Sequence, residues 1–359
     1  MRRILFASFG IALWACHGGG GDDNNNSIDA SGSGTVDAGP PIEGTPYTIS
    51  WGSVSVPSTH ENTQCVVLQL PNTTTIQIHQ IHNTTSTATH HVIVYKDDDP
   101  AAVVQSTPTD CQPFTGALNP SGMISPVMIT QKQDDLLTLP DGVAYQFAAG
   151  QFIRLEMHYI NTTDGPLTAT ETTTFYAADP ATITDQADLL FIGSPDIGTN
   201  PQTGIAAGAS FTLHQFFQPG ASETFLDAKI FAITGHEHKT GTDVVVKTGT
   251  SATDQAMTTV YDPMPFQWSE PATTVHNPTF GIPAGGGFDF TCSYTNTTNA
   301  AVKFGESATN EMCFFWAYYY PAHGSHVCVH TNQFGSLNVC CPAAAGDQLA
   351  TTVCSMIAP

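Results

Sequence analysis

The sequence has few charged residues and hardly any basic ones. Charged residues make up 11% of the 359 residues, whereas they make up about 25% of an average soluble chain. Only 9 residues are Lys or Arg, against 31 Asp or Glu, and Arg2 and Arg3 stand at the N-terminus. A chain with so little positive charge is poorly suited to phosphate groups. We therefore exclude nucleic-acid binding, and docking to an anionic membrane through a basic patch.

The apolar run at residues 4–15 is too short to span a bilayer. It follows two arginines and ends in Leu-Trp-Ala-Cys, which is typical of a secretory signal peptide and resembles a bacterial lipobox at Cys16. We predict a signal segment at 1–16 and a flexible linker at 17–45, which is rich in Gly and Asn. The prediction is an exported bacterial protein that is lipid-anchored to the cell envelope through Cys16. Ordinary secretion is the alternative.

The chain contains no Cys-x-x-Cys pair, which argues against a zinc ribbon or a thioredoxin-like centre. Apart from Cys16, eight cysteines remain, and an even number in an exported protein predicts disulfides. Eight cysteines allow about 105 pairings. Counting alone therefore leaves the connectivity open, and the sequence does not assign partners to Cys328, Cys340, Cys341 and Cys354.

Helical periodicity is almost absent after about residue 47. Short alternating runs recur instead, for example at 65–70, 152–159 and 243–247, and turn-rich stretches separate them. This pattern predicts an all-β fold of antiparallel, jelly-roll-like β-sandwiches, and about 300 residues are more than one sandwich usually holds. We place the boundary near residue 183. The predicted parts are a first sandwich, a second sandwich and a C-terminal tail, at 46–182, 183–345 and 346–359.

Five histidines lie in strand-like runs: His90, His91, His158, His236 and His238. Residues two apart on a strand share a face, so His236 and His238 can bind one ion. His90 and His91 would point to opposite faces of a regular strand. They can share a metal only at a β-bulge or by using different ring nitrogens. Alternation around His158 buries its apolar neighbours and turns the imidazole outward.

Met312 and Cys313 are adjacent, so they face opposite sides of a strand. Cys313 can then point inward to a disulfide while Met312 faces the His236/His238 surface. Imidazole together with a thioether favours copper, particularly Cu(I). A lone His is usually a polar surface residue and a lone Met is usually in the core. The complete order of His-His, His, His-x-His and Met-Cys in an exported β-rich chain is more specific.

This order resembles the copper type II, ascorbate-dependent monooxygenases, over residues from about 65 to 320. The resemblance implies two β-sandwich domains, each carrying one copper, on faces across an open cleft. It implies a first copper site made by His90, His91 and His158, and a second made by His236, His238 and Met312. It also implies two disulfides, Cys65–Cys111 and Cys292–Cys313.

The same resemblance implies the activity. Such an enzyme hydroxylates a C–H bond of a small organic substrate with O2 and a reductant such as ascorbate. Its cofactors are two copper ions, the first for electron transfer and the second for O2 activation at His236, His238 and Met312. The alternative is a non-catalytic exported lipoprotein that binds and sequesters copper.

The chain departs from the family where peptide-amidating members hold a substrate carboxylate. An Arg and a Tyr do so there, and the matching residues here are Thr234 and Trp316. Arg154 is the only arginine after the signal segment, and a carboxylate clamp needs a forked cation. We therefore expect a neutral or cationic small molecule. Trp316 and Tyr318 share the Met312 face and could form an aromatic platform for it, or could pack against a neighbouring loop.

Overall fold

The first half of the chain forms two sheets that pack around a shared apolar core. The computed structural model describes residues 41–113, 123–341 and 347–357. One sheet has the order β1-β10-β3-β8-β11, with β7 paired to β3, and the other has the order β5-β2-β9-β4-β6. The strands of the first sheet are β1 (Thr45–Val56), β3 (Ile76–Thr85), β7 (Asp134–Thr138), β8 (Val143–Phe147), β10 (Leu167–Ala178) and β11 (Asp185–Gln186). Those of the second are β2 (Glu61–Gln69), β4 (Thr89–Asp97), β5 (Gln105–Asp110), β6 (Ile124–Thr130) and β9 (Phe152–Ile160).

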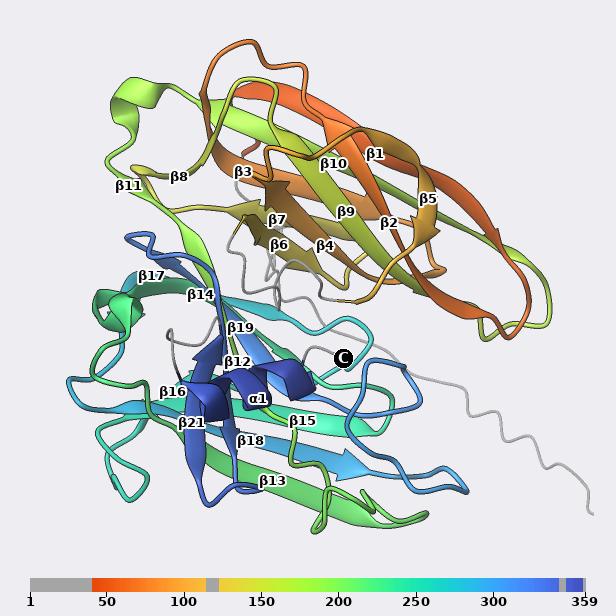
Figure 1. The fold of residues 1–359 in the computed structure, drawn as a ribbon, viewed down its shortest axis with the longest axis vertical. Helices are drawn as coiled ribbons and strands as arrows, with labels where there is room; N and C mark the ends of the chain where they lie inside the picture. The colour runs from red at the N-terminus through yellow and green to blue at the C-terminus, as the bar shows by residue number, and fades with distance from the viewer. Residues whose placement is uncertain (1–40, 114–122, 342–346, 358–359) are drawn as a thin grey trace, which may run out of the picture. The chain divides into compact units, whose positions relative to one another are not determined.

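The second half repeats the two-sheet plan with different strand orders, β17-β14-β19-β12-β20-β21 and β13-β18-β15-β16 (Figure 1). The six-stranded sheet contains β12 (Asp188–Ser194), β14 (Lys229–His236), β17 (Thr273–Gly281), β19 (Cys313–Tyr320), β20 (His326–Thr331) and β21 (Leu337–Cys341). The four-stranded sheet contains β13 (Ser210–Phe217), β15 (Gly241–Gly249), β16 (Thr258–Tyr261) and β18 (Gly287–Thr295). The prediction of an all-β fold with sandwich architecture is confirmed.

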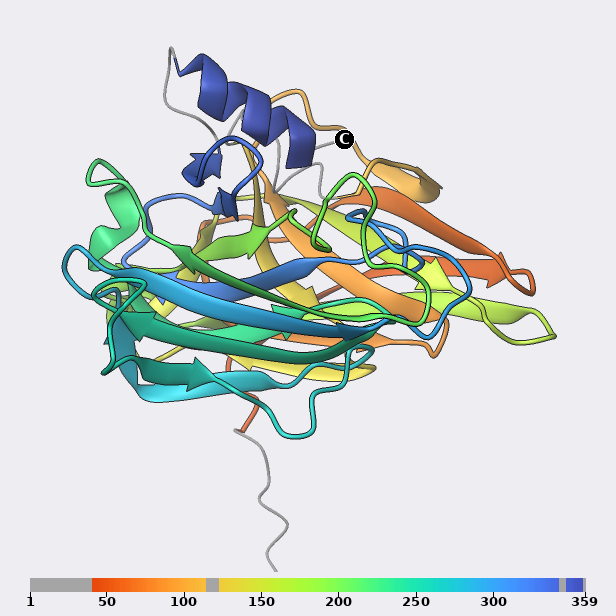
Figure 2. The same ribbon diagram turned by 90° about the horizontal axis from the view of Figure 1, so that it is seen from below.

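Two strand pairs are parallel, β8 with β11 and β12 with β20; the other pairs between named strands are antiparallel. Two short 3-10 helices, η1 (Pro180–Thr182) and η2 (Thr224–Asp227), lie in the connections between β10 and β11 and between β13 and β14. The predicted tail contains a helix, α1 (Gln348–Ile357), that lies beside β21 and outside the sheets (Figure 2). No helix among the described residues is long and apolar enough to cross a membrane.

Strand β19 separates two apolar cores. Alternate side chains on a strand point to opposite faces, and here each face meets a different core. One set packs inside the second half: Cys313, Phe315, Ala317 and Tyr319. The other set belongs to a core that continues into the first half: Met312, Phe314, Trp316 and Tyr318. The predicted parity of Met312 and Cys313 is therefore confirmed.

Four disulfides are present among the described residues. Cys65–Cys111 and Cys292–Cys313 are the two pairs that the family resemblance implies, and both are confirmed. The other two are Cys328–Cys340, which crosses the β20–β21 pair, and Cys341–Cys354, which ties α1 to β21. Because Cys340 and Cys341 are neighbours on one strand, their side chains leave opposite faces and reach different partners.

Sheet membership changes between β11 and β12, that is, between Gln186 and Asp188. Residues 42–359 nevertheless cluster as one compact unit, and one apolar core includes residues of both halves. The division into separate domains at residue 183 stays a prediction. The signal segment, Cys16 and most of the linker lie outside the described residues.

Candidate metal centre

His236 stands at the end of β14, where the strand lies unusually close to its neighbours. A Cβ atom on Gly235 would lie 2.7 Å from side-chain atoms of both Tyr261 and Val244. Glycine is therefore required for this close approach. Strand β14 pairs with β19 so that His236 lies opposite Phe314. This register brings the imidazole next to the segment that carries Met312.

His238 lies beyond the end of β14, so the strand ladder does not position it. Its backbone N–H donates to Glu311 Oε2 at 2.9 Å. The other carboxylate oxygen accepts from the N–H and the hydroxyl of Thr240 at 2.6 and 2.7 Å. Because Glu311 directly precedes Met312, this buried carboxylate joins the turn that carries His238 to the start of β19. The His-x-His spacing works here through a turn and not through a regular strand.

The imidazoles of His236 and His238 already face one another. The Nδ1 of His236 lies 2.8 Å from Gln131 Oε1, and the Nδ1 of His238 lies 3.3 Å from the Asn310 carbonyl oxygen. Both partners are acceptors, so each Nδ1 carries the proton and each Nε2 has a lone pair. The two Nε2 atoms are 3.2 Å apart. Two lone pairs at this separation repel, and a cation bound by both would remove the repulsion.

The first-half set depends on a β-bulge in β4. The register of β4 against β9 shifts between Thr89 and His91, so His90 is the extra residue. A β-bulge was one of the two alternatives that the His-His pair left open, and its presence allows neighbouring histidines to approach the same region. The ring centroids are 5.4 Å apart for His90 and His91, 5.2 Å for His90 and His158, and 5.0 Å for His91 and His158. The Nε2 atom of His90 is buried without a hydrogen-bond partner.

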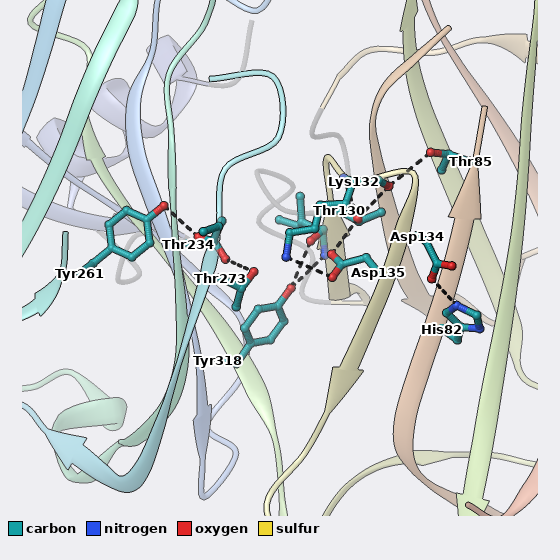
Figure 3. A network of polar contacts seen from close by, with 12 residues as sticks. His82, Thr85, Thr130, Lys132, Asp134, Asp135, Thr234, Tyr261, Thr273 and Tyr318 are labelled. Atoms are coloured by element: carbon teal, nitrogen blue, oxygen red, sulfur yellow. Dashed lines mark hydrogen bonds and ion pairs between the residues drawn. The ribbon is translucent and has the colours of Figure 1, made fainter. Parts of the chain in front are cut away.

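The two histidine sets form one cluster. The ring centroids of His90 and His238 are 6.1 Å apart, and those of His91 and His236 are 6.3 Å apart. The open cleft that the family resemblance implies does not separate these described residues. The halves contact each other directly here, for example where the Tyr318 hydroxyl of β19 accepts from the Ile129 N–H of β6 at 3.0 Å (Figure 3).

Burial keeps these imidazoles neutral. Desolvation, followed by the proximity of other histidines, lowers the pKa of His90, His91 and His236 well below its ordinary value. Desolvation likewise lowers the pKa of His238 to about 4. Neutral imidazole is the form that binds metals. At neutral pH the four rings therefore offer lone pairs and not positive charges.

The residues fit copper, but the two sets are not equally arranged for it. Among the described residues, no three His, Cys, Asp or Glu side chains are in place to hold one ion. The three histidines of the first set therefore require ring rotations to converge. The second set consists of the two facing Nε2 atoms of His236 and His238 and the thioether of Met312. Methionine is not one of the four residue types just considered. Imidazole and thioether donors suit copper.

Met312 and His236 line a small, mainly apolar cavity of about 30 Å³. The other lining residues are Ile129, Phe191, Phe304, Phe314, Trp316, Val327, His91, Gln131 and Glu306. Burial raises the pKa of Glu306 to about 8, so this carboxyl group is uncharged at pH 7. The lining therefore carries no fixed charge at neutral pH.

The predicted aromatic pair is divided between two environments. Trp316 lines the cavity and lies 5.8 Å from the His236 ring. Tyr318 instead contacts strand β6, not a loop, and it is not among the cavity residues. Thr234 pairs its hydroxyl with that of Thr273 at 2.9 Å (Figure 3). Arg154 lies 3.7 Å from Asp97 and is not among the cavity residues.

Four residues that orient the histidines were not identified from the sequence: Glu61, Gln131, Asn310 and Glu311. Gln131 is 105 positions from His236, and Glu61 is 97 positions from His158, so no local pattern connects them. Glu311 had a weak signal, because it directly precedes Met312. Buried carboxylates beside a ligand often orient it.

The comparisons with known proteins bear on the second half. Residues 199–339 match the sequence model of the copper type II ascorbate-dependent monooxygenase C-terminal domain. The match includes His236, His238 and Met312, and it confirms the suspected family for this segment. The first-half histidines lie outside it. No curated protein gives a significant match to the chain.

Two solved structures that resemble the chain are distant likenesses. The chain is similar to the empty top-component particle of cowpea mosaic virus, at 8% identity and a TM-score of 0.32, covering 84% of this chain and 97% of that one. It is also similar to the PBSX exported protein XepA, at 11% identity and a TM-score of 0.20, covering 77% and 88%. Likenesses at this level carry no argument about function.

Proposed function

From a second half that matches the C-terminal domain of copper type II, ascorbate-dependent monooxygenases, we propose that the chain is a two-copper monooxygenase. It hydroxylates a C–H bond of a small, neutral, apolar substrate. The observation that supports this most strongly is the pair of facing Nε2 atoms of His236 and His238, 3.2 Å apart within the matched segment, where His236 and Met312 line one cavity.

Each ligand set has a proposed role. His90, His91 and His158 would hold the copper that receives electrons from ascorbate or an equivalent reductant. His236, His238 and Met312 would hold the copper at which O2 is used. Bound copper supplies one-electron redox chemistry and O2 activation, and a thioether favours its reduced state. The protein orients the imidazoles through Gln131, Asn310 and Glu61.

The cavity supports the substrate class. Its lining is aromatic and aliphatic apart from His91, Gln131, His236 and Glu306. An anionic substrate would find no cation there, and a cationic one would find Glu306 uncharged at neutral pH. The present cavity of about 30 Å³ is far smaller than the roughly 300 Å³ of a typical ligand site. The two halves must therefore move apart, or side chains must rotate, before an organic substrate enters.

The proposed location is the bacterial cell envelope, with the folded part held there by a lipid on Cys16. The proposal includes no partner other than the small molecules of the reaction. Mass spectrometry of the N-terminal peptide from the native membrane fraction tests the lipid. An unmodified Cys16, or a chain that begins after it, would contradict the anchor.

The experiment for the activity uses purified, copper-loaded protein with ascorbate in air-saturated buffer. Three substrate panels are compared: neutral aromatic or aliphatic molecules, aromatic amines, and glycine-extended peptides. We expect O2 uptake that requires ascorbate, with one oxygen atom added to a neutral substrate by mass spectrometry. Addition to the peptides alone would contradict the substrate class. Tight copper binding without any ascorbate-dependent product would favour the copper-sequestering alternative.

A further inference from the structure

Glu61, the first residue of β2, accepts hydrogen bonds from both halves of the protein. Its Oε1 lies 2.8 Å from His158 Nε2 and 2.9 Å from the Ala308 N–H. Its Oε2 lies 3.3 Å from the Ser307 hydroxyl. Because the Ala308 N–H and the Ser307 hydroxyl donate to its two oxygens, Glu61 acts here as a hydrogen-bond acceptor.

These contacts fix the tautomer of His158. A carboxylate only accepts hydrogen bonds, so Nε2 of His158 must carry the proton that it donates. In the neutral ring the lone pair is then on Nδ1, which is the nitrogen available to a metal. A carboxylate behind a metal-binding histidine also increases the donor strength of the ring.

The loop that Glu61 anchors also reaches the second ligand set. Ser307 and Ala308 contact Glu61, and two residues later the Asn310 carbonyl accepts from His238 Nδ1 at 3.3 Å. Glu311 then accepts from the His238 N–H at 2.9 Å, and Met312 follows directly. One run of six residues, 307–312, therefore begins at the carboxylate behind His158 and ends at the thioether of the other set.

We propose that Glu61 is a positioning residue that orients His158 and, through the loop 307–312, keeps the two copper-ligand sets together. The inference rests on the proposed function, because it assigns His158 to a copper site. Glu61 touches neither substrate nor reacting atoms, and it acts through His158 and the loop.

In the other histidine–carboxylate pairs of the described residues, the carboxylate does not contact both a proposed copper ligand and the loop 307–312. His82 Nε2 lies 2.7 Å from Asp134 Oδ1, and neither residue contacts a proposed ligand (Figure 3). The Asp134 side chain is 77% exposed, whereas that of Glu61 is 23% exposed and lines a pocket with His158 and Ser307. Asp134→Asn therefore provides a matched control that removes one carboxylate from a histidine in the same half.

The test compares Glu61→Ala, Glu61→Gln and Asp134→Asn with the unmodified protein, using two readouts. In copper-free protein, hydrogen exchange is measured on the peptide that contains residues 305–311. We expect the Ala308 amide to exchange at least about tenfold faster in Glu61→Ala, because its acceptor is lost. In copper-loaded protein, we expect first-site affinity to fall about 10- to 100-fold in Glu61→Ala.

Two further observations separate positioning from simple loss of structure. The reduction potential of the first copper should rise in Glu61→Ala and Glu61→Gln, because the anionic partner of His158 is gone. Glu61→Gln should retain more copper affinity than Glu61→Ala, because the Gln carbonyl can still accept from His158. Asp134→Asn should match the unmodified protein in both readouts.

If Glu61→Ala matched Asp134→Asn in Ala308 exchange and in copper affinity, while the unmodified protein bound two coppers, the inference would be overturned and the proposed function would stand. If the unmodified protein bound no copper, the proposed function would fail, and the assignment of Glu61 to a metal site would fail with it. The exchange measurement would still report whether Glu61 holds the loop.

Discussion

The two histidine sets meet in one cluster but differ in how nearly each is arranged for a metal. In the second-half set, the Nε2 atoms of His236 and His238 are 3.2 Å apart, and an oxygen acceptor fixes each ring from behind. The ring-centroid separations are alike, 4.9 Å for His236 and His238 and 5.0 to 5.4 Å in the first-half set. In the first-half set, however, the three imidazoles are not placed to hold one ion. The imidazoles of the second set are held in place by hydrogen-bond partners that lie outside the His-x-His motif.

The origin of those partners explains the difference. Asn310 belongs to the loop before β19, but Gln131 follows β6 of the first half. The second set is therefore completed only when the halves pack together. In the first set, Glu61 orients His158, whereas His90 has a buried Nε2 without a partner. A bulge brings two adjacent histidines together without fixing the rotation of their rings.

The largest effect should come from removing the soft ligand of the second set. Met312→Ile roughly preserves volume, so we expect it to cost less than about 1.5 kcal/mol of unfolding free energy. Turnover should fall by more than about 100-fold, because even residues behind a ligand cost up to that factor. Ascorbate should still reduce the first-site copper at an unchanged rate. Stopped-flow reduction and product formation check both; turnover at the unmodified rate would show that Met312 is not a ligand.

Removing one disulfide from each half compares how much each bond contributes to the free energy of unfolding. Cys65–Cys111 closes 46 residues and Cys292–Cys313 closes 21. Chain entropy alone predicts losses of about 4 and about 3 kcal/mol of unfolding free energy when each pair is replaced by Ala. Denaturant unfolding of the two double variants measures the losses. If a double variant were as stable as the intact protein, the disulfide that it lacks would not constrain the unfolded chain.

The first sandwich should also respond to pH through Glu171. This buried carboxyl accepts from the Trp51 N–H and the Asn83 amide, and burial raises its pKa from 4.5 to about 7. The folded state therefore binds a proton that the unfolded state has released between pH 4.5 and 7. Its stabilising contribution is full below about pH 4.5 and is lost as pH rises through 7.

We expect that loss to be on the order of 3 kcal/mol. Glu171→Gln cannot titrate, so the difference in unfolding free energy between this variant and the intact protein should change by that amount from pH 4.5 to pH 8. Denaturant unfolding at several pH values measures it. A difference that stays constant with pH would mean that Glu171 titrates normally.

The smallest effect concerns the contribution of the first half to the second ligand set. Gln131→Ala removes the acceptor behind His236, and we expect copper affinity at the second site to fall about tenfold. Gln218→Ala removes an exposed amide contact to the Gly285 carbonyl and serves as the control. Copper titration separates the two variants. Equal affinities would show that Gln131 does not prepare the site.

The sequence predicted features that depend on strand periodicity. The all-β class and the opposite faces of Met312 and Cys313 follow from alternation of side chains. The bulge at His90 was one of two alternatives that the His-His pair left open. The two disulfides Cys65–Cys111 and Cys292–Cys313 came from the family resemblance. Local rules suffice for such features, because they act over a few residues of one strand.

Features that depend on packing between distant segments could not be predicted. The contact between the histidine sets arises when β4 and β9 meet the second-half sheet, and no sequence pattern reports that distance. Helix α1 was predicted only as part of a tail: it is 10 residues long, and so short a helix depends on tertiary contacts. The Cys341–Cys354 disulfide provides such a contact.

The most direct test of the central claim is a copper count on the intact protein and three single variants. We expect two coppers per chain in the intact protein, and one in each of His91→Ala and His236→Ala. His214→Ala, which removes a largely exposed imidazole paired with Asp289, should retain two. A single copper in the intact protein, or no loss in His236→Ala, would contradict the account of two ligand sets in one cluster.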